Sequence, residues 1–240
     1  MRAWGSIPSV HYDETGWPVQ QEIQGSFGWV ITGTDTADSL FTLGESRGKG
    51  VAQRLKGDSD HIGITDDYGA YRNLFTKHQL CWAHPLRKLR DLSQSEELDP
   101  EKKGYCLTLY QKFKELYERV EMICALPIDQ RRPYVKELLQ RFIQIAKPRA
   151  DDSIKLVTIK KSLVKNKQAY FTCLDYDQVP LTNNKAERAL RHLVLKRRIS
   201  HGSKTQAGAE RTSILASVLL SLWWSRPDNF FKAYQELRGV

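Results

Sequence analysis

The first 66 residues alternate between short apolar runs and turn-forming residues, which is typical of strands. A helix-like stretch at 50–55, bounded by Gly57, precedes the last of these runs. The order of three strands, a helix and a strand predicts a mixed sheet with an α/β continuation. The runs cover residues 9–15, 27–32, 39–43 and 61–66, and Gly16, Pro18 and Gly44 separate them.

After these strands the apolar residues recur at helical spacing. Residues 68–75 and 82–92 predict short helices, and 101–126, 131–146 and 153–172 predict longer ones, separated by prolines. We interpret the block from 95 to 178, which has no strand signal, as an all-helical insertion. The clearest helical stripe consists of Tyr105, Leu109, Phe113, Leu116 and Val120.

The last third begins with a loop that leads into a capped helix. Thr182, Asn183 and Asn184 are all suitable N-cap residues for that helix. Residues 194–206 are basic and predict a loop, whereas 207–224 predict an apolar helix and 228–237 a short final one. The predicted segments of the chain are therefore 1–94, 95–178 and 179–240.

The positive charge is unevenly distributed along the 240 residues. The chain has 37 Lys and Arg against 28 Asp and Glu, a net charge of +9. Residues 1–80 carry 7 basic and 10 acidic side chains, 81–180 carry 19 and 14, and 181–240 carry 11 and 4. An acidic first third followed by a basic end indicates a polyanionic partner, and nucleic acid is the first candidate.

The composition also excludes several classes of protein. With 40% hydrophobic and 27% charged residues, the chain is neither collagen-like nor fully disordered. We expect no membrane-spanning segment and a cytoplasmic location, because the longest apolar run, 214–224, is interrupted by Ser217 and Ser221. The four cysteines form no CxxC pair and predict free, buried thiols.

Three acidic residues are candidates for catalysis. Asp13 lies toward the end of the first predicted strand, Asp66 ends the fourth, and Glu187 lies in the first turn of a later helix. If these two strands are neighbours, the three carboxylates converge, and they then need cations to offset their repulsion. Oxygen ligands suit Mg²⁺ or Mn²⁺, and a pair of such ions catalyses phosphoryl transfer.

Other interpretations of these acids remain open. Asp13 is also compatible with a turn cap, and Glu14 or Asp67 are neighbours that could serve instead. Glu187 and Arg191 are four residues apart on a helix, the spacing of a surface ion pair.

Four motifs together resemble the transposases of the insertion sequence 66 type. They are Tyr12-Asp13-Glu14-Thr15, the Thr65-Asp66-Asp67-Tyr68-Gly69-Ala70-Tyr71 run, Cys81-Trp82-Ala83-His84, and the Asn183-Asn184-Lys185-Ala186-Glu187-Arg188-Ala189-Leu190-Arg191 run. Their order and spacing match, and the resemblance extends from about residue 8 to about residue 235. The combination of the third and fourth motifs is its most specific part.

The resemblance implies an RNase H-like DDE catalytic core. On this basis the fold is α/β, with a mixed five-stranded sheet flanked by helices and a fifth strand near 79–81. The helical insertion then lies between the second Asp and the Glu, which are 121 residues apart. Asp13, Asp66 and Glu187 would be the catalytic residues and ligands of two Mg²⁺ (or Mn²⁺) ions. The chain departs from the family pattern at Asp67, where the family has Gly.

The resemblance also assigns roles around the carboxylates. Cys81 and His84 are expected to be structural or accessory near the site, although their spacing also fits half of a metal site, and Asn184 belongs to the same accessory group. The cationic run would hold DNA phosphates. Val194 stands where some compact DDE enzymes have a basic residue, and the Trp223–Trp224 pair predicts core packing rather than base stacking. The cationic run consists of Arg188, Arg191, Lys196, Arg197 and Arg198.

The function implied is metal-dependent DNA strand cleavage and strand transfer in transposition. Partners would be transposon ends and target DNA, with a homo-oligomer assembled on DNA and the protein associated with the nucleoid. Family members carry an N-terminal DNA-recognition portion that this sequence is expected to lack. The alternatives are therefore a non-catalytic remnant that binds DNA or another transposase copy, and a general RNase H-like nuclease.

Overall fold

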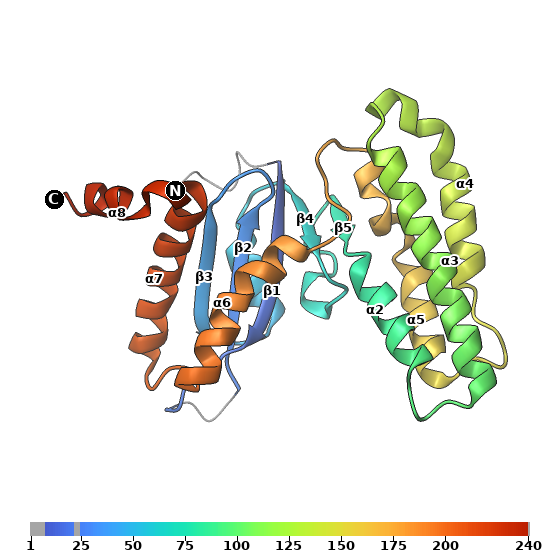
Figure 1. Ribbon diagram of the computed structural model, residues 1–240, viewed down its shortest axis with the longest axis horizontal. Coiled ribbons are helices and arrows are strands. Elements are labelled where there is room, and N and C mark those ends of the chain that lie inside the picture. The colour runs from blue at the N-terminus through green and yellow to red at the C-terminus, as the bar shows by residue number, and fades with distance from the viewer. Residues whose placement is uncertain (1–7, 22–24, 240) are drawn as a thin grey trace. The chain divides into compact units, whose positions relative to one another are not determined.

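The computed structural model describes residues 8–21 and 25–239 (Figure 1). The chain forms two compact units, one made of 1–77 with 183–240 and the other of 78–182. The helical segment predicted for 95–178 lies inside the second unit, which begins earlier, at His78. No helix among the described residues is long and apolar enough to cross a bilayer.

Five strands form a mixed sheet in the order β3-β2-β1-β4-β5. β1 pairs antiparallel with β2 and parallel with β4, and β2 pairs antiparallel with β3. The predicted α/β class and the five predicted strands are confirmed, as is the proximity of the first and fourth strands. The strands are β1 Ser9–Gly16, β2 Phe27–Gly33, β3 Ser39–Glu45, β4 Ile62–Thr65 and β5 His78–Leu80.

Alternating side chains of β1 and β2 enter two separate hydrophobic cores. Tyr12 and Ile31 face a core that includes helix α1 (Lys49–Lys56) and Tyr71. Val30, from the same strand as Ile31, faces the opposite core with helices α6 (Asn184–Ser200) and α7 (Gln206–Ser225). This two-residue period places successive side chains of one strand on opposite faces of the sheet.

Helix α6 packs across β1 and β2 on one face of the sheet (Figure 1). It buries Ala186, Ala189, Leu190 and Leu193, which recur at helical spacing. The loop predicted for 194–206 is wrong for its first half, because the helix continues to Ser200. Lys and Arg are good helix formers and are favourable near a helix C-terminus, so a basic run does not end a helix.

Helix α7 lies along β3, and the short helix α8 (Phe230–Arg238) follows it (Figure 1). The predicted burial of both tryptophans near its end is wrong for Trp223, which is 48% exposed. Trp224 is half-buried, with its ring centroid 5.8 Å from that of His192. The predicted helix at 68–75 is also wrong, because only Gly69–Tyr71 form a 3₁₀ turn and Asn73 has a φ of 57°, which an α-helix does not accept.

The second unit is built from helices around Trp82. Its indole Nε1 donates to the carbonyl of Tyr170 at 2.7 Å, and its ring meets that of Phe142 edge to face at 5.5 Å. The predicted stripe on α3 is buried from Leu109 onward. The predicted helix at 153–172 ends at Lys165, and two 3₁₀ turns follow. The helices are α2 Ala83–Ser93, α3 Pro100–Cys124, α4 Ile128–Ala146 and α5 Ile154–Lys165.

All four cysteines are free thiols, as predicted. Cys81, Cys106 and Cys173 are buried, whereas Cys124 is half-buried. Cys124 donates through Sγ to the carbonyl of Cys173 at 3.6 Å. These residues therefore contribute to packing as small hydrophobic side chains.

Candidate active site

Asp13, on β1, and Asp66, directly after β4, lie near the same end of two neighbouring parallel strands. The last register pair of β1 and β4 is His11 with Ile64. Asp13 lies two residues beyond His11, and Asp66 lies two residues beyond Ile64. Because parallel strands advance at the same rise per residue, this equal spacing places the two residues near the same edge of the sheet.

The pleat of β1 separates Asp13 from Glu14. His11, and Asp13 two residues later, face helix α6, whereas Glu14 faces the core of Tyr71. The Tyr71 hydroxyl donates to Glu14 Oε2 at 2.6 Å, and Arg47 donates to Glu14 Oε1 at 2.8 Å. Glu14 is thus held on the opposite face from α6, and Asp13 is the β1 carboxylate that faces Glu187.

Asn183 fixes the beginning of α6 against β1. Its side-chain amide donates to the carbonyl of Tyr12 at 2.8 Å, and its Oδ1 accepts from His11 Nδ1 at 3.0 Å. The amide oxygen can only accept, so the proton of the neutral imidazole is on Nδ1. Glu187 lies one helical turn after Asn183 and donates its backbone N–H to the Asn183 carbonyl at 3.2 Å. The two side-chain hydrogen bonds of Asn183 therefore fix the position of Glu187 relative to β1.

The electrostatics of Asp13 report the neighbouring carboxylates. Burial raises the pKa of Asp13 well above its ordinary value, and the charges of Glu14, Asp66 and Glu187 raise it further. The Glu14 N–H, which donates to Asp13 Oδ1 at 2.9 Å, opposes this shift. The charges of Asp66 and Glu187 thus act on Asp13, and all three residues are half-buried.

Neighbouring groups remain uncharged or neutralised. Burial lowers the pKa of His11 to about 4, and the positive charges of Lys185 and Arg188 add to this effect. Burial raises the pKa of Glu14, while the hydrogen bonds from Tyr71 and Arg47 act in the opposite direction. At neutral pH, His11 therefore acts as a neutral hydrogen-bond donor.

The two adjacent aspartates after β4 have different environments. Asp66 Oδ1 accepts from the backbone N–H of Tyr68 at 3.0 Å, which fixes the carboxylate at the strand end. Asp67 lies 3.9 Å from the guanidinium of Arg72. The charge of Asp66 is among those that raise the pKa of Asp13, so Asp66 shares the electrostatic environment of Asp13.

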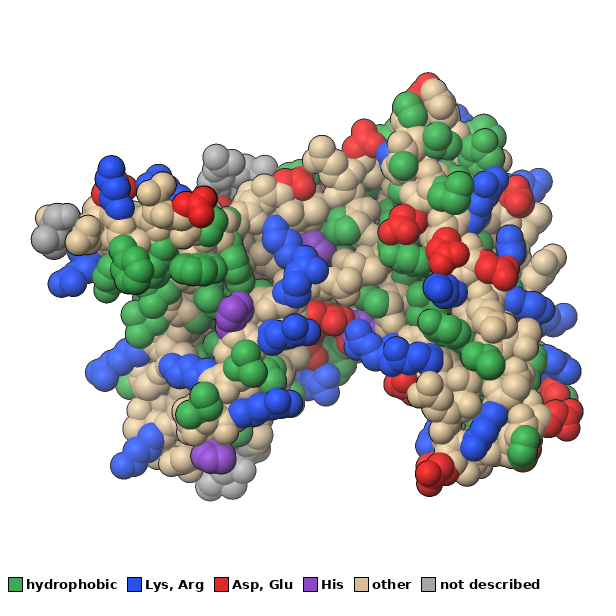
Figure 2. Space-filling view, in the orientation of Figure 1, with side chains coloured by type: hydrophobic (Ala, Val, Ile, Leu, Met, Phe, Trp, Pro, Cys, Tyr) green, Lys and Arg blue, Asp and Glu red, His purple; other side chains and the backbone are tan. Residues whose placement is uncertain are grey.

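The residues of the cationic run lie along α6, but they differ in exposure and in their contacts. Basic side chains gather over α6 in Figure 2, beside a small acidic group. Arg188, Arg191, Lys196 and Arg198 are exposed, whereas Arg197 is half-buried. Arg197 donates to the carbonyl of Gly16 and to Thr15 Oγ1. Arg197 therefore ties the end of α6 to the end of β1, which its place in a basic run did not indicate.

A cavity of about 270 Å³ lies beside these cations. Lys185 lines the cavity and donates to the carbonyls of Gly33, Thr34 and Thr36 at 2.6, 2.8 and 2.6 Å. Burial lowers the pKa of this ammonium group. The cavity thus combines cations with aromatic rings. Its lining residues are Thr32, Lys185, Arg188, Ala189, His192 and Trp224.

The accessory residues expected from the sequence occupy different environments. Asn184 is exposed in the first turn of α6, whereas its neighbour Asn183 is fully buried and bonds to β1. Cys81 is buried after β5, and His84 is half-buried in the first turn of α2. The sequence predicts Asn183 as a helix cap, but its side chain makes no capping bond. The sequence does not reveal the partners of four further residues, because these partners lie far away along the chain. The four residues belong to the motifs or lie near them in space, and they are Asn183, Lys185, Arg47 and Tyr71.

Comparison with known proteins identifies the class. A family model described as "Transposase IS66 family" matches residues 5–211. The match covers most of the chain and assigns it to the transposases. Within this class, the chain belongs to the IS66 family.

A relative from Sinorhizobium fredii (strain NBRC 101917 / NGR234), described as "Uncharacterized protein y4hP", is 27% identical over 160 residues. The match covers 58% of this chain and 28% of that protein. The matched region is thus a little over a quarter of the relative's length.

Proposed function

We propose that this chain is the catalytic core of a DDE transposase, which cleaves a DNA strand and joins the freed 3′ end to target DNA. Asp13, Asp66 and Glu187 would be the catalytic carboxylates. The observation that carries this proposal is that Asp13 and Asp66 each follow by two residues the last paired residues of parallel strands β1 and β4, with Glu187 one helical turn after Asn183, which bonds to β1. Membership of the IS66 family supports the same assignment.

The chemistry of the three carboxylates suits a divalent metal. A bound cation would offset the repulsion that Asp66 and Glu187 exert on the partly buried Asp13, and hard oxygen donors suit Mg²⁺ or Mn²⁺. When bound, such a metal polarises the phosphate and lowers the pKa of an attacking water. The residues Asp13, Asp66 and Glu187 would hold it, and we expect two ions by analogy with the chemistry of strand transfer.

The protein's own groups would orient the nucleic acid. Arg188 and Arg191, which follow Glu187 on α6, are exposed and would neutralise phosphates on the strand next to the carboxylates. Neutral His11 and Asn183 would keep Glu187 in place without adding a charge. The chain would therefore supply position and electrostatics, which dominate catalysis of phosphoryl transfer.

The test is metal-dependent nicking of supercoiled plasmid and strand transfer of a labelled 3′ end by the purified chain. We expect Asp66→Asn to lower the rate at least about 100-fold in Mg²⁺ and in Mn²⁺, because a metal ligand is lost. Asp67→Asn is the matched control, since it removes the adjacent carboxylate, which lies beside the guanidinium of Arg72. Its rate should stay within about three-fold of that of the unmodified chain.

Two outcomes would reject the proposal. One is equal activity of Asp66→Asn and the unmodified chain, which would identify a contaminating nuclease as the source. The other is no turnover in either metal while DNA binding is retained, which would identify a non-catalytic DNA-binding protein. Cleavage of RNA–DNA hybrids in preference to duplex DNA would instead indicate a general RNase H-like nuclease.

A further inference from the structure

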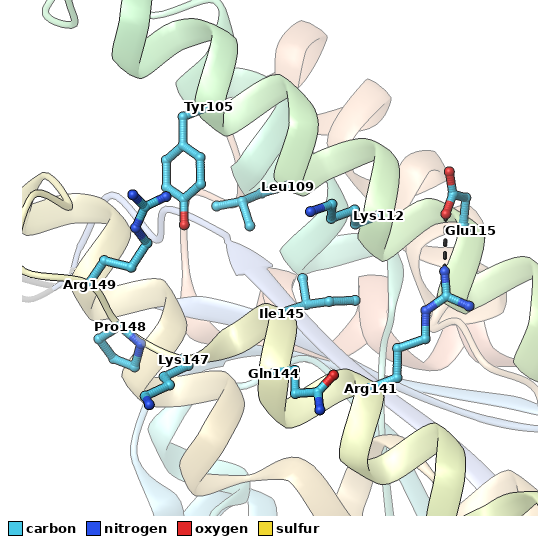
Figure 3. A pocket seen from close by; sticks show the side chains of 10 residues that line it. All are labelled: Tyr105, Leu109, Lys112, Glu115, Arg141, Gln144, Ile145, Lys147, Pro148 and Arg149. Carbon is cyan, nitrogen blue, oxygen red and sulfur yellow. Dashed lines mark hydrogen bonds and ion pairs between the residues drawn. The ribbon is translucent and has the colours of Figure 1, made fainter.

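The helical unit contains an open groove of about 630 Å³ between α3, α4 and the loop that follows α4. Figure 3 shows side chains from both helices and from the loop pointing toward this space. Its floor includes buried Leu109 and half-buried Ile145, and its rim is charged. The lining residues are Tyr105, Leu109, Lys112, Glu115, Arg141, Gln144, Ile145, Lys147, Pro148 and Arg149.

The excess positive charge of the helical unit is concentrated at this rim. Residues 78–182 contain 19 Lys and Arg and 14 Asp and Glu, a net charge of +5. Four of those cations and one carboxylate line the groove, so the lining residues sum to +3. The carboxylate, Glu115, pairs with Arg141 at 3.1 Å, while Lys112 and Lys147 are exposed. Such local concentration of one sign attracts a polyanion.

A buried ion pair holds the loop side of the groove. Lys160 and Asp152 are 2.8 Å apart with side-chain exposures of 1% and 0%. Lys160 also donates to the Tyr105 hydroxyl at 2.8 Å, and Asp152 Oδ2 accepts from the Arg149 N–H at 2.7 Å. This network ties α5, α3 and the loop together, so the backbone at Arg149 is fixed before any ligand binds.

Arg149 is held at the rim by contacts with two side chains. Its guanidinium carbon lies 4.6 Å from the centroid of the Tyr105 ring, and its Nε lies 3.3 Å from Asp151. The Tyr105 ring is in turn fixed by Lys160. A guanidinium stacked on an aromatic ring keeps its outer N–H groups available for a phosphate, which it can bind in a bidentate manner.

We propose that this groove binds the sugar-phosphate backbone of DNA as a second contact surface, separate from the basic face of α6. Phosphates would meet the cations of the rim, and deoxyribose would pack against the apolar floor. This inference rests on the proposed function only in assuming that the chain handles DNA. It adds that the helical unit contributes its own part of the affinity.

The test measures binding of a fluorescently labelled duplex by anisotropy, with EDTA present, over a series of salt concentrations. The full chain is compared with a Lys112→Gln/Lys147→Gln variant. The matched control is Lys136→Gln/Lys161→Gln, which removes two exposed lysines of the same unit that do not line the groove. Both double variants have the same net charge, and circular dichroism verifies their fold.

We expect the groove variant to bind DNA about ten-fold more weakly. The slope of log K against log salt concentration should become less steep by about two, the value for two lost phosphate contacts. The control should stay within about two-fold of the unmodified chain. Equal losses in both variants, or no DNA binding by the unmodified chain, would overturn the proposal. Because the readout is binding without metal, loss of nicking activity alone would reject the catalytic assignment and leave the groove intact.

Discussion

The backbone N–H of Phe41 donates a hydrogen bond of 2.8 Å to Ser217 Oγ, joining the edge strand β3 to helix α7. Ser213 and Ser221, one turn before and after, accept from Leu43 N and Ser39 N at 2.9 Å each. Two residues of a strand and four residues of a helix both advance by about 6 to 7 Å, so the two repeats stay in register. The helix thereby satisfies the outer N–H groups of an edge strand, which are otherwise a site of aggregation.

Replacing Ser217 by Ala should destabilise the protein by about 1–3 kcal/mol, because the buried N–H of Phe41 loses its acceptor. Urea unfolding followed by circular dichroism gives the free energy. Ser225→Ala is the control, since Ser225 is exposed and bonds only within its own helix, to Leu222. An equal effect of the two substitutions would show that the bond across β3 contributes nothing specific.

The contact between β3 and the serines of α7 could not be predicted from the sequence. The serines at 217 and 221 interrupt the apolar run of 214–224, and from the sequence they only argue against a membrane span. Their function depends on β3, which lies more than 170 residues away, and no local pattern records that pairing. The strands themselves were predictable, because β-branched and aromatic runs separated by glycine carry a local signal.

The environment around the carboxylates shows the same limit. Motif resemblance selected Asp13, Asp66 and Glu187, but could not separate Asp13 from Glu14 in physical terms until the pleat of β1 was known. Similarly, Asn183 and Asn184 are equivalent N-cap candidates by composition. Only the position of β1 below the helix makes one of them buried and leaves the other exposed.

Asn183→Ala should therefore impair catalysis, whereas Asn184→Ala should not. Loss of the bonds to Tyr12 and His11 frees the start of α6 and displaces Glu187, so we expect the rate of DNA nicking to fall about 10- to 100-fold. The rates of both variants are measured at saturating Mn²⁺, with unfolding curves recorded in parallel. Comparable rates for the two variants would remove the positioning role from Asn183.

Arg191→Gln and Arg197→Gln should separate DNA binding from stability, although the two arginines lie on the same helix. Arg191 is exposed, so its loss should make the salt dependence of DNA binding less steep by about one and leave unfolding unchanged. Arg197 bonds to Gly16 and Thr15, so its loss should lower the free energy of unfolding by about 1–2 kcal/mol. If Arg197→Gln changes only the salt dependence, its contacts with β1 are not stabilising.

Asp13→Asn should make the metal-free protein more stable while it removes activity. The pKa of Asp13 is raised in the folded state, so the folded chain binds this proton more tightly than the unfolded chain. Above the ordinary pKa of the carboxyl, ionisation therefore costs folded stability, and the cost increases with pH until the folded pKa is reached. Asparagine keeps the acceptor for the Glu14 N–H and carries no charge.

The measurement is thermal unfolding in EDTA from about pH 5 to about pH 8. Each kcal/mol of stability should shift the melting temperature by about 2–4 °C. The excess stability of Asp13→Asn over the unmodified chain should increase toward the upper end of this range. Adding Mn²⁺ should then raise the melting temperature of the unmodified chain more than that of Asp13→Asn, because a shared cation relieves the repulsion among the three carboxylates. If the unmodified chain is the more stable of the two in EDTA throughout this pH range, the charge of Asp13 does not destabilise the folded protein. The carboxylates then require no cation to offset their repulsion.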